Sequence, residues 1–180
     1  MKKLILPVIL CAITSYGFSQ TEETRTRAHE IGIDVFDLAI MRTIDVTYEY
    51  VKNPNIGFGL TARYCFDSDS YREEIYGITP FFRVYFFNKM DYGSKGFYAE
   101  SFLKLFGVKN YDYNYSNGYY IGKTTKVNSN VAFGVGLGYK YVNHSGFILD
   151  INGGIGRSFK NSNYSSEFTM RGSILFGYRF

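Results

Sequence analysis

The residues that could do nucleophilic chemistry are few in this chain. It contains two histidines, His29 and His144, and the second stands directly before Ser145. A serine hydroxyl is a poor nucleophile without a neighbouring base, so a hydrolase or acyltransferase would need this pair together with an acid. We place "NHSG" in a turn between two strands, and therefore favour a solvated turn over a catalytic dyad.

The carboxylates and the thiol indicate no stronger site. Asp67 and Asp69 in "DSDS" resemble the start of a calcium loop, but its glycine and closing glutamate are missing. Glu100 and Asp150 could pair as catalytic acids, but each has a base to pair with, which favours structural ion pairs. Cys65 is expected inside the fold, where a free thiol is inert packing. We therefore expect no cofactor, no metal and no enzymatic activity.

The elements that position these residues are predicted to be strands. The chain has 18 Tyr, 17 Phe and 19 Gly but only three Pro, a composition that suits strands. Apolar and polar residues alternate with period two, and after the first twenty residues no apolar run is long enough for a membrane helix. Each of the segments can reach the ~9–11 residues that a tilted membrane strand needs, the first only just. The eight predicted strands are Glu30–Leu38, Arg42–Val51, Ile56–Phe66, Tyr76–Asn88, Phe97–Tyr115, Tyr119–Val142, Phe147–Phe159 and Glu167–Phe180.

The two faces of these segments differ in a way that predicts the fold class. One face is apolar and aromatic, from Ile31 and Ile33 to Phe176. Six acids balance six bases on the other, as an enclosed network requires and a solvated surface does not. The charged set is Glu30, Asp34, Asp45, Glu49, Glu100, Asp150, Arg63, Arg83, Lys104, Lys140, Arg171 and Arg179. We predict an all-β fold: a closed, antiparallel, eight-stranded up-and-down transmembrane β-barrel, apolar side outward and without an open pore.

Hairpin registers that match the turns bring opposite charges together. The expected lumen ion pairs are Asp45 with Arg63, Arg83 with Glu100, and Lys140 with Asp150. The connections "KNPN", "KMDYGSKG" and "NHSG" then lie at one end of the barrel, together with both termini.

Segments 5 and 6 are much longer than a membrane strand needs. We read "SNG" as a three-residue hairpin loop with Gly118 in the left-handed conformation. Large inward residues then meet small ones, as a narrow lumen requires. The predicted partners are Tyr115 with Tyr119, Tyr113 with Ile121, Tyr98 with Gly136, Glu100 with Gly134, and Phe102 with Ala132.

This hairpin is predicted to project beyond the membrane as a tyrosine-rich surface. Its candidate contact residues are Tyr111, Tyr113, Tyr115, Tyr119 and Tyr120. Tyrosine offers a large apolar face and a hydroxyl at little entropic cost, which suits an extracellular protein or carbohydrate partner. An exposed hairpin without a partner is the alternative.

The N-terminus predicts a secretory signal over residues 1–19, with the barrel domain over 20–180. Lys2 and Lys3 precede the apolar run Leu4–Ile13, and Gly17 and Ser19 supply small residues for cleavage. Removing the two lysines lowers the formal net charge from +4 to +2, which gives no push toward nucleic acid.

The predicted mature chain resembles the small eight-stranded outer-membrane barrels of Gram-negative bacteria, the OmpX and OmpA-transmembrane type. More narrowly, "TYEYV", "ITPFFRVYF", "GFYAESFL" and "GYRF" resemble a bacterial domain-of-unknown-function barrel family. The resemblance implies an outer-membrane monomer whose partners are membrane lipids and the barrel assembly machinery. Tyr178 and Phe180 match the aromatic positions of the C-terminal assembly signal, whereas Leu175 stands where that signal often has glycine.

Three functions remain open at this point. A structural or surface-interaction barrel with an adhesion-like role is favoured. A lipid-modifying enzyme of the lipid A deacylase or acyltransferase kind is the alternative, and a secreted soluble barrel that binds a small ligand is the third.

Overall fold

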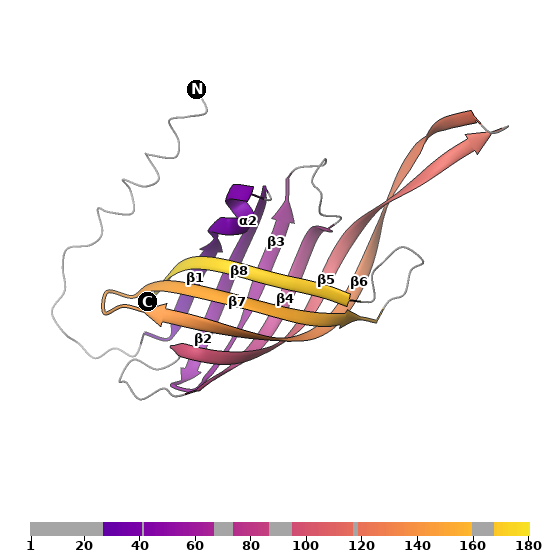
Figure 1. The fold of residues 1–180 in the computed structure, drawn as a ribbon. Coiled ribbons are helices and arrows are strands. Elements are labelled where there is room, and N and C mark those ends of the chain that lie inside the picture. Colours follow the sequence, from indigo (N-terminus) through magenta and orange to yellow (C-terminus); the bar gives the residue numbers. More distant parts are fainter. Residues whose placement is uncertain (1–26, 41, 67–73, 87–94, 117–118, 160–167) are drawn as a thin grey trace, which may run out of the picture.

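The computed structural model describes residues 27–40, 42–66, 74–86, 95–116, 119–159 and 168–180 (Figure 1). For Ile40, 110–116, 119–121, Lys123 and Thr125 it describes the backbone alone. The predicted signal over 1–19, the acids Asp67 and Asp69, and the predicted left-handed Gly118 lie outside the described residues.

Eight strands form one closed barrel, in which each strand pairs antiparallel with its neighbours in sequence and β1 pairs with β8. This confirms the predicted fold class. The described part contains one helix, α2 (Val35–Ile40), which is too short to cross a membrane. The strands are β1 (His29–Asp34), β2 (Thr43–Asn53), β3 (Ile56–Cys65), β4 (Glu74–Tyr85), β5 (Gly96–Ser116), β6 (Tyr119–Val142), β7 (Phe147–Ser158) and β8 (Phe168–Arg179).

The first strand is shorter than predicted. Instead of continuing to Leu38, β1 ends at Asp34 and the chain enters α2. The reason is a helix cap: Asp34 Oδ1 accepts hydrogen bonds from the backbone N–H groups of Phe36 at 2.9 Å and Asp37 at 3.1 Å. The helix lies at one end of the barrel (Figure 1), which we call the hairpin end because β5 and β6 project from it. The opposite end, where β1 begins and β8 finishes, is the terminal end.

The predicted division into two faces is confirmed. Along β4, Ile78 and Phe82 are exposed, whereas Phe81 and Arg83, which point the other way, are at most 4% exposed. Every strand contributes exposed large apolar residues, and the buried side chains of the barrel include nearly all its acids and most of its lumen bases. The barrel is therefore apolar outside and charged inside.

The register of β5 against β6 differs from the prediction by two residues. Tyr98, Glu100 and Phe102 lie opposite Gly138, Gly136 and Gly134. The shift arises because β5 runs to Ser116 and β6 begins at Tyr119, which leaves two connecting residues instead of three, and because a bulge follows Asn114. An even shift leaves every side chain on its predicted face.

Large residues still meet small ones across this pair of strands. A Cβ added at Gly134 would overlap the Phe102 ring, and one added at Gly138 would overlap the Tyr98 ring. The glycines of β6 thus make room for the aromatic side chains of β5 inside a narrow lumen.

Candidate functional site: the charged lumen and the projecting hairpin

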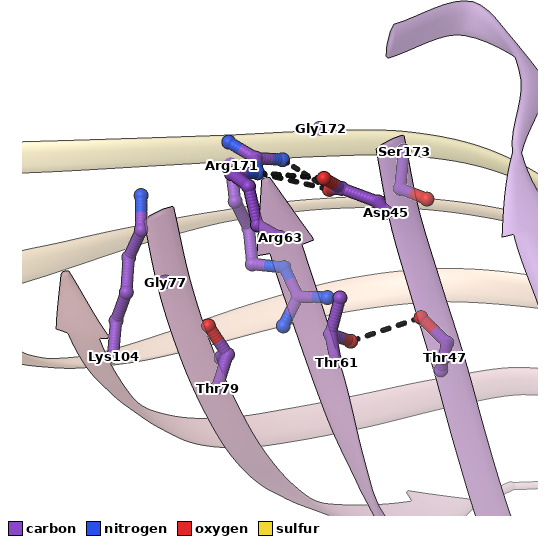
Figure 2. A pocket seen from close by; sticks show the side chains of 10 residues that line it. All are labelled: Asp45, Thr47, Thr61, Arg63, Gly77, Thr79, Lys104, Arg171, Gly172 and Ser173. Atoms are coloured by element: carbon purple, nitrogen blue, oxygen red, sulfur yellow. Dashed lines mark hydrogen bonds and ion pairs between the residues drawn. The ribbon is translucent and has the colours of Figure 1, made fainter. Parts of the chain in front are cut away.

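Arg63 links three elements near the hairpin end of the lumen. It lies opposite Asp45 as predicted, and its Nε donates to Asp45 Oδ1 at 2.9 Å and Oδ2 at 3.0 Å (Figure 2). Its Nη2 also donates to Asp37 Oδ2 of α2 at 2.7 Å, and Nη1 lies 3.4 Å from Glu74 Oε2. The predicted ion pair is confirmed, and it belongs to a larger cluster.

Arg83 is the centre of a second network closer to the terminal end. Its Nε donates to the predicted partner Glu100 at 2.8 Å, and Nη1 donates to Glu49 and Asp150 at 2.7 Å each. The guanidinium carbon lies 4.4 Å from the ring centre of Tyr98, within cation–π range. All these side chains are at most 4% exposed.

Lys140 has different partners from those predicted. It does lie opposite Asp150 in the register, but its Nζ donates to Glu30 and Glu49 at 2.7 Å each. Asp150 instead accepts from Arg83 and, at 2.6 Å, from the Tyr98 hydroxyl. The predicted Lys140–Asp150 pair is wrong because side chains in a narrow lumen reach across it to strands that are not their neighbours.

The network at the terminal end is balanced in charge. Arg171 donates to Glu100 at 2.8 Å, and Arg179 donates to Glu30 at 2.7 Å. Four acids thus meet four bases, and we call this set the terminal network: Glu30, Glu49, Glu100, Asp150, Arg83, Lys140, Arg171 and Arg179. Together with the buried rings of Phe81, Tyr85, Tyr98 and Phe102, it fills the lumen at this level.

A small polar cavity lies between the terminal network and the hairpin end (Figure 2). Its volume is about 20 Å³, room for a single water molecule. Thr47 and Thr61 share a hydroxyl–hydroxyl hydrogen bond of 2.9 Å on its wall, and Lys104 and Arg171 also line it. A pocket for an organic substrate has a volume of about 300–1,000 Å³, so this cavity suits water rather than a substrate.

The two histidines lie at the terminal end. His144 is exposed in the predicted turn between β6 and β7. His29 Nδ1 lies 2.7 Å from the Tyr48 hydroxyl, and its ring stacks on Phe180 at 5.9 Å. The described residues do not bring a histidine, a serine and an acid together at the hairpin end, which the predicted topology places at the outer leaflet. Cys65 is buried, as predicted.

The aromatic residues at the C-terminus are on the outer face of the terminal end. Tyr178 packs edge-on against Phe147 at 5.6 Å, and the backbone N–H of Phe180 donates to the carbonyl of His29 at 2.8 Å. Tyr178 and Phe180 are 39% and 55% exposed. Their recognition by the assembly machinery stays a prediction.

The β5–β6 hairpin extends far beyond the rest of the barrel (Figure 1). β5 pairs with β4 only as far as Val108, and β6 pairs with β7 only from Ala132 onward. Between Lys109 and Ser116, β5 pairs with β6 alone. The predicted tyrosines lie on this projecting section, but their side chains are outside the described ones: Tyr111, Tyr113, Tyr115, Tyr119 and Tyr120.

Sequence reasoning missed two acids of the lumen. The alternation pattern predicts Asp37 within a strand and Glu74 within a loop, whereas both contact Arg63. An Asp followed three residues later by a second acid is a helix-start pattern, so Asp34 and Asp37 carried a signal for α2.

No family model matches this chain, and no curated protein or solved structure is significantly similar to it.

Proposed function

We propose that this protein is a non-enzymatic integral outer-membrane barrel that holds the β5–β6 hairpin outside the cell as an interaction surface. The observation that carries the proposal is the inverted arrangement of the barrel. Arg83, Glu49 and Lys140 are buried in the lumen, while large apolar side chains such as Leu137 and Met170, 70% and 79% exposed, surround the outside.

This arrangement suits lipid better than water. Monomeric soluble proteins rarely expose contiguous apolar patches larger than a few hundred Å². In a bilayer the same surface is favourable, and a closed barrel leaves no unpaired strand edge in the hydrocarbon. β2, β3, β4, β7 and β8 have 10 to 12 residues each, close to the ~9–11 residues of a tilted membrane strand.

The projecting hairpin supports the second half of the proposal. Beyond Val108 and before Ala132 each of its strands has one edge without a neighbouring strand in the barrel. An open edge can accept a strand from a partner, and the sequence there is rich in tyrosine. In the barrels that this chain resembles, the termini face the periplasm, so the hairpin would face outward.

Membrane fractionation tests the location. The full chain expressed in a Gram-negative host should stay in the membrane pellet after alkaline extraction, and should migrate faster on gels when unboiled than when boiled. Recovery as a soluble monomer without detergent would contradict the proposal.

Excision of the hairpin tip tests the interaction role. Asp112 faces Thr124 in the register, so residues 113–123 between them can be replaced by an Asn-Gly turn that joins these two positions. The barrel should retain its heat-dependent gel mobility, and bacteria that express the variant should lose adherence to protein-coated and polysaccharide-coated surfaces. Unchanged adherence would leave the hairpin without this role.

A further inference from the structure

The charges that face the lumen are not balanced at the hairpin end. Beside the terminal network, in which four acids meet four bases, the described lumen contains the acids Asp34, Asp37, Asp45 and Glu74 with the bases Arg63 and Lys104. Lys104 Nζ donates to Glu74 Oε1 at 2.5 Å, and Arg63 contacts Asp37, Asp45 and Glu74. Among the described residues at this end, four acids therefore face two bases inside the barrel.

Three of these acids meet at one point, and we call them the carboxylate triad: Asp34, Asp37 and Asp45. They come from the end of β1, from α2 and from β2, and each contributes one oxygen to a set that lies within 4.8 Å of one another. Asp34, Asp37 and Asp45 are 1%, 0% and 4% exposed, respectively. Burial of like charges at such distances is unfavourable unless a proton or a cation compensates them.

Asp34 shows that the compensation is incomplete among the described residues. Its Oδ1 caps α2 by accepting from two backbone N–H groups. Its Oδ2 is buried and has no hydrogen-bond partner among the described residues. A buried oxygen of this kind costs free energy unless it gains a ligand.

We propose that the carboxylate triad binds a hard divalent cation, Ca²⁺ in the first place. Carboxylate oxygens are the ligands that Ca²⁺ prefers, and oxygens within 4.8 Å of one another can share one ion whose ligands lie at about 2.3–2.6 Å. Mg²⁺, with ligands at about 2.0–2.1 Å, demands a near-ideal octahedral shell, whereas Ca²⁺ accepts the irregular geometry of side chains from three different elements. The ion contributes the missing positive charge and joins α2 to β1 and β2, so that it fixes the helix at the mouth of the barrel.

Calcium titration of the folded full chain tests this site. The chain is stripped with EDTA, moved to chelator-free buffer and titrated with CaCl₂ in a calorimeter, and its thermal unfolding is followed with and without Ca²⁺. We expect one ion per chain with a Kd at or below ~1 mM, and a higher unfolding temperature in Ca²⁺. Asp34→Asn should abolish both effects, because asparagine keeps the helix cap but removes the charge.

The matched control is Glu74→Gln, which removes a carboxylate outside the triad and should still bind Ca²⁺. Asp45→Asn is a second triad variant if Asp34→Asn fails to fold, and it too should lose the binding heat. Absence of Ca²⁺ binding by the unmutated chain would overturn the proposal and leave a proton as the compensating charge. Binding that persists in the triad variants would overturn it as well.

Discussion

Arg83 and Glu100 face each other across β4 and β5, and Arg83 Nε donates to Glu100 Oε2 at 2.8 Å inside a lumen where both are at most 4% exposed. The same guanidinium also contacts Glu49 and Asp150. One arginine therefore neutralises charge from three other strands, and the network stabilises the barrel across its width rather than only along one hairpin.

Arg83→Leu should destabilise the barrel by about 3–5 kcal/mol, because it leaves buried carboxylates without their base. Glu100→Leu in the same chain should recover part of this loss, with a coupling free energy of ~0.5–3 kcal/mol. The free energy of unfolding is measured by denaturant titration of the folded barrel. Arg83→Leu combined with Glu74→Gln is the control and should be additive, since Glu74 contacts Arg63 and Lys104 instead. Additivity in the Arg83–Glu100 cycle would contradict their pairing.

Gly138→Ala should cost about 1–3 kcal/mol of unfolding free energy, because the added Cβ would overlap the Tyr98 ring that fills the lumen. Gly153→Ala on the adjacent β7 is the matched control. There the nearest heavy atom, the carbonyl oxygen of Arg171, is 3.9 Å from the added Cβ, so the change should stay within ~0.5 kcal/mol. Equal effects of the two substitutions would contradict the register in which Tyr98 faces Gly138.

Val135→Arg distinguishes a lipid-facing surface from a solvated one. Val135 is 56% exposed on the outer face of β6, and an arginine near the middle of a bilayer costs ~2–4 kcal/mol in a membrane barrel. Val127→Arg is the control: the same residue type, on the same strand and 49% exposed, but in the projecting hairpin. In lipid vesicles Val135→Arg should lower the unfolding free energy while Val127→Arg changes it little. Tolerance of both would argue against a membrane position for the barrel.

The fold was accessible from the sequence because alternation with period two assigns each side chain to a face without knowledge of its partners. Asp45 and Arg63 were paired correctly because they face each other on adjacent strands joined by a short turn. The same rule pairs Lys140 with Asp150, which does face it in the register, but the ion-pair partners of Lys140 are Glu30 and Glu49, from strands that reach it only after the barrel closes. Hairpin neighbours can be read from sequence spacing, whereas contacts across a lumen depend on closure.

Local signals that compete with alternation explain the other differences. Ile31, Ile33 and Val35 continue one apolar face, which predicted a longer first strand, yet the cap made by Asp34 starts a helix instead. That helix turns Asp37 into the lumen. In β5 and β6, the two-residue connection and the bulge after Asn114 together shift the register by two residues, which leaves every face unchanged and so cannot be found from a face pattern.

The orientation of the barrel can be tested with two single cysteines at its opposite ends. Thr124 is exposed on the projecting part of β6, and Ser145 is exposed in the turn between β6 and β7. The native Cys65 is buried, so a chain without added cysteine should give little background. A polymer-linked maleimide too large for porins should label Thr124→Cys on intact cells, and should label Ser145→Cys only after the outer membrane is permeabilised.

If the hairpin is the partner-binding surface, it must be accessible from outside, because a periplasmic hairpin could not reach an extracellular protein or carbohydrate. Labelling of Ser145→Cys but not Thr124→Cys on intact cells would therefore reverse the topology and remove the basis for the interaction role.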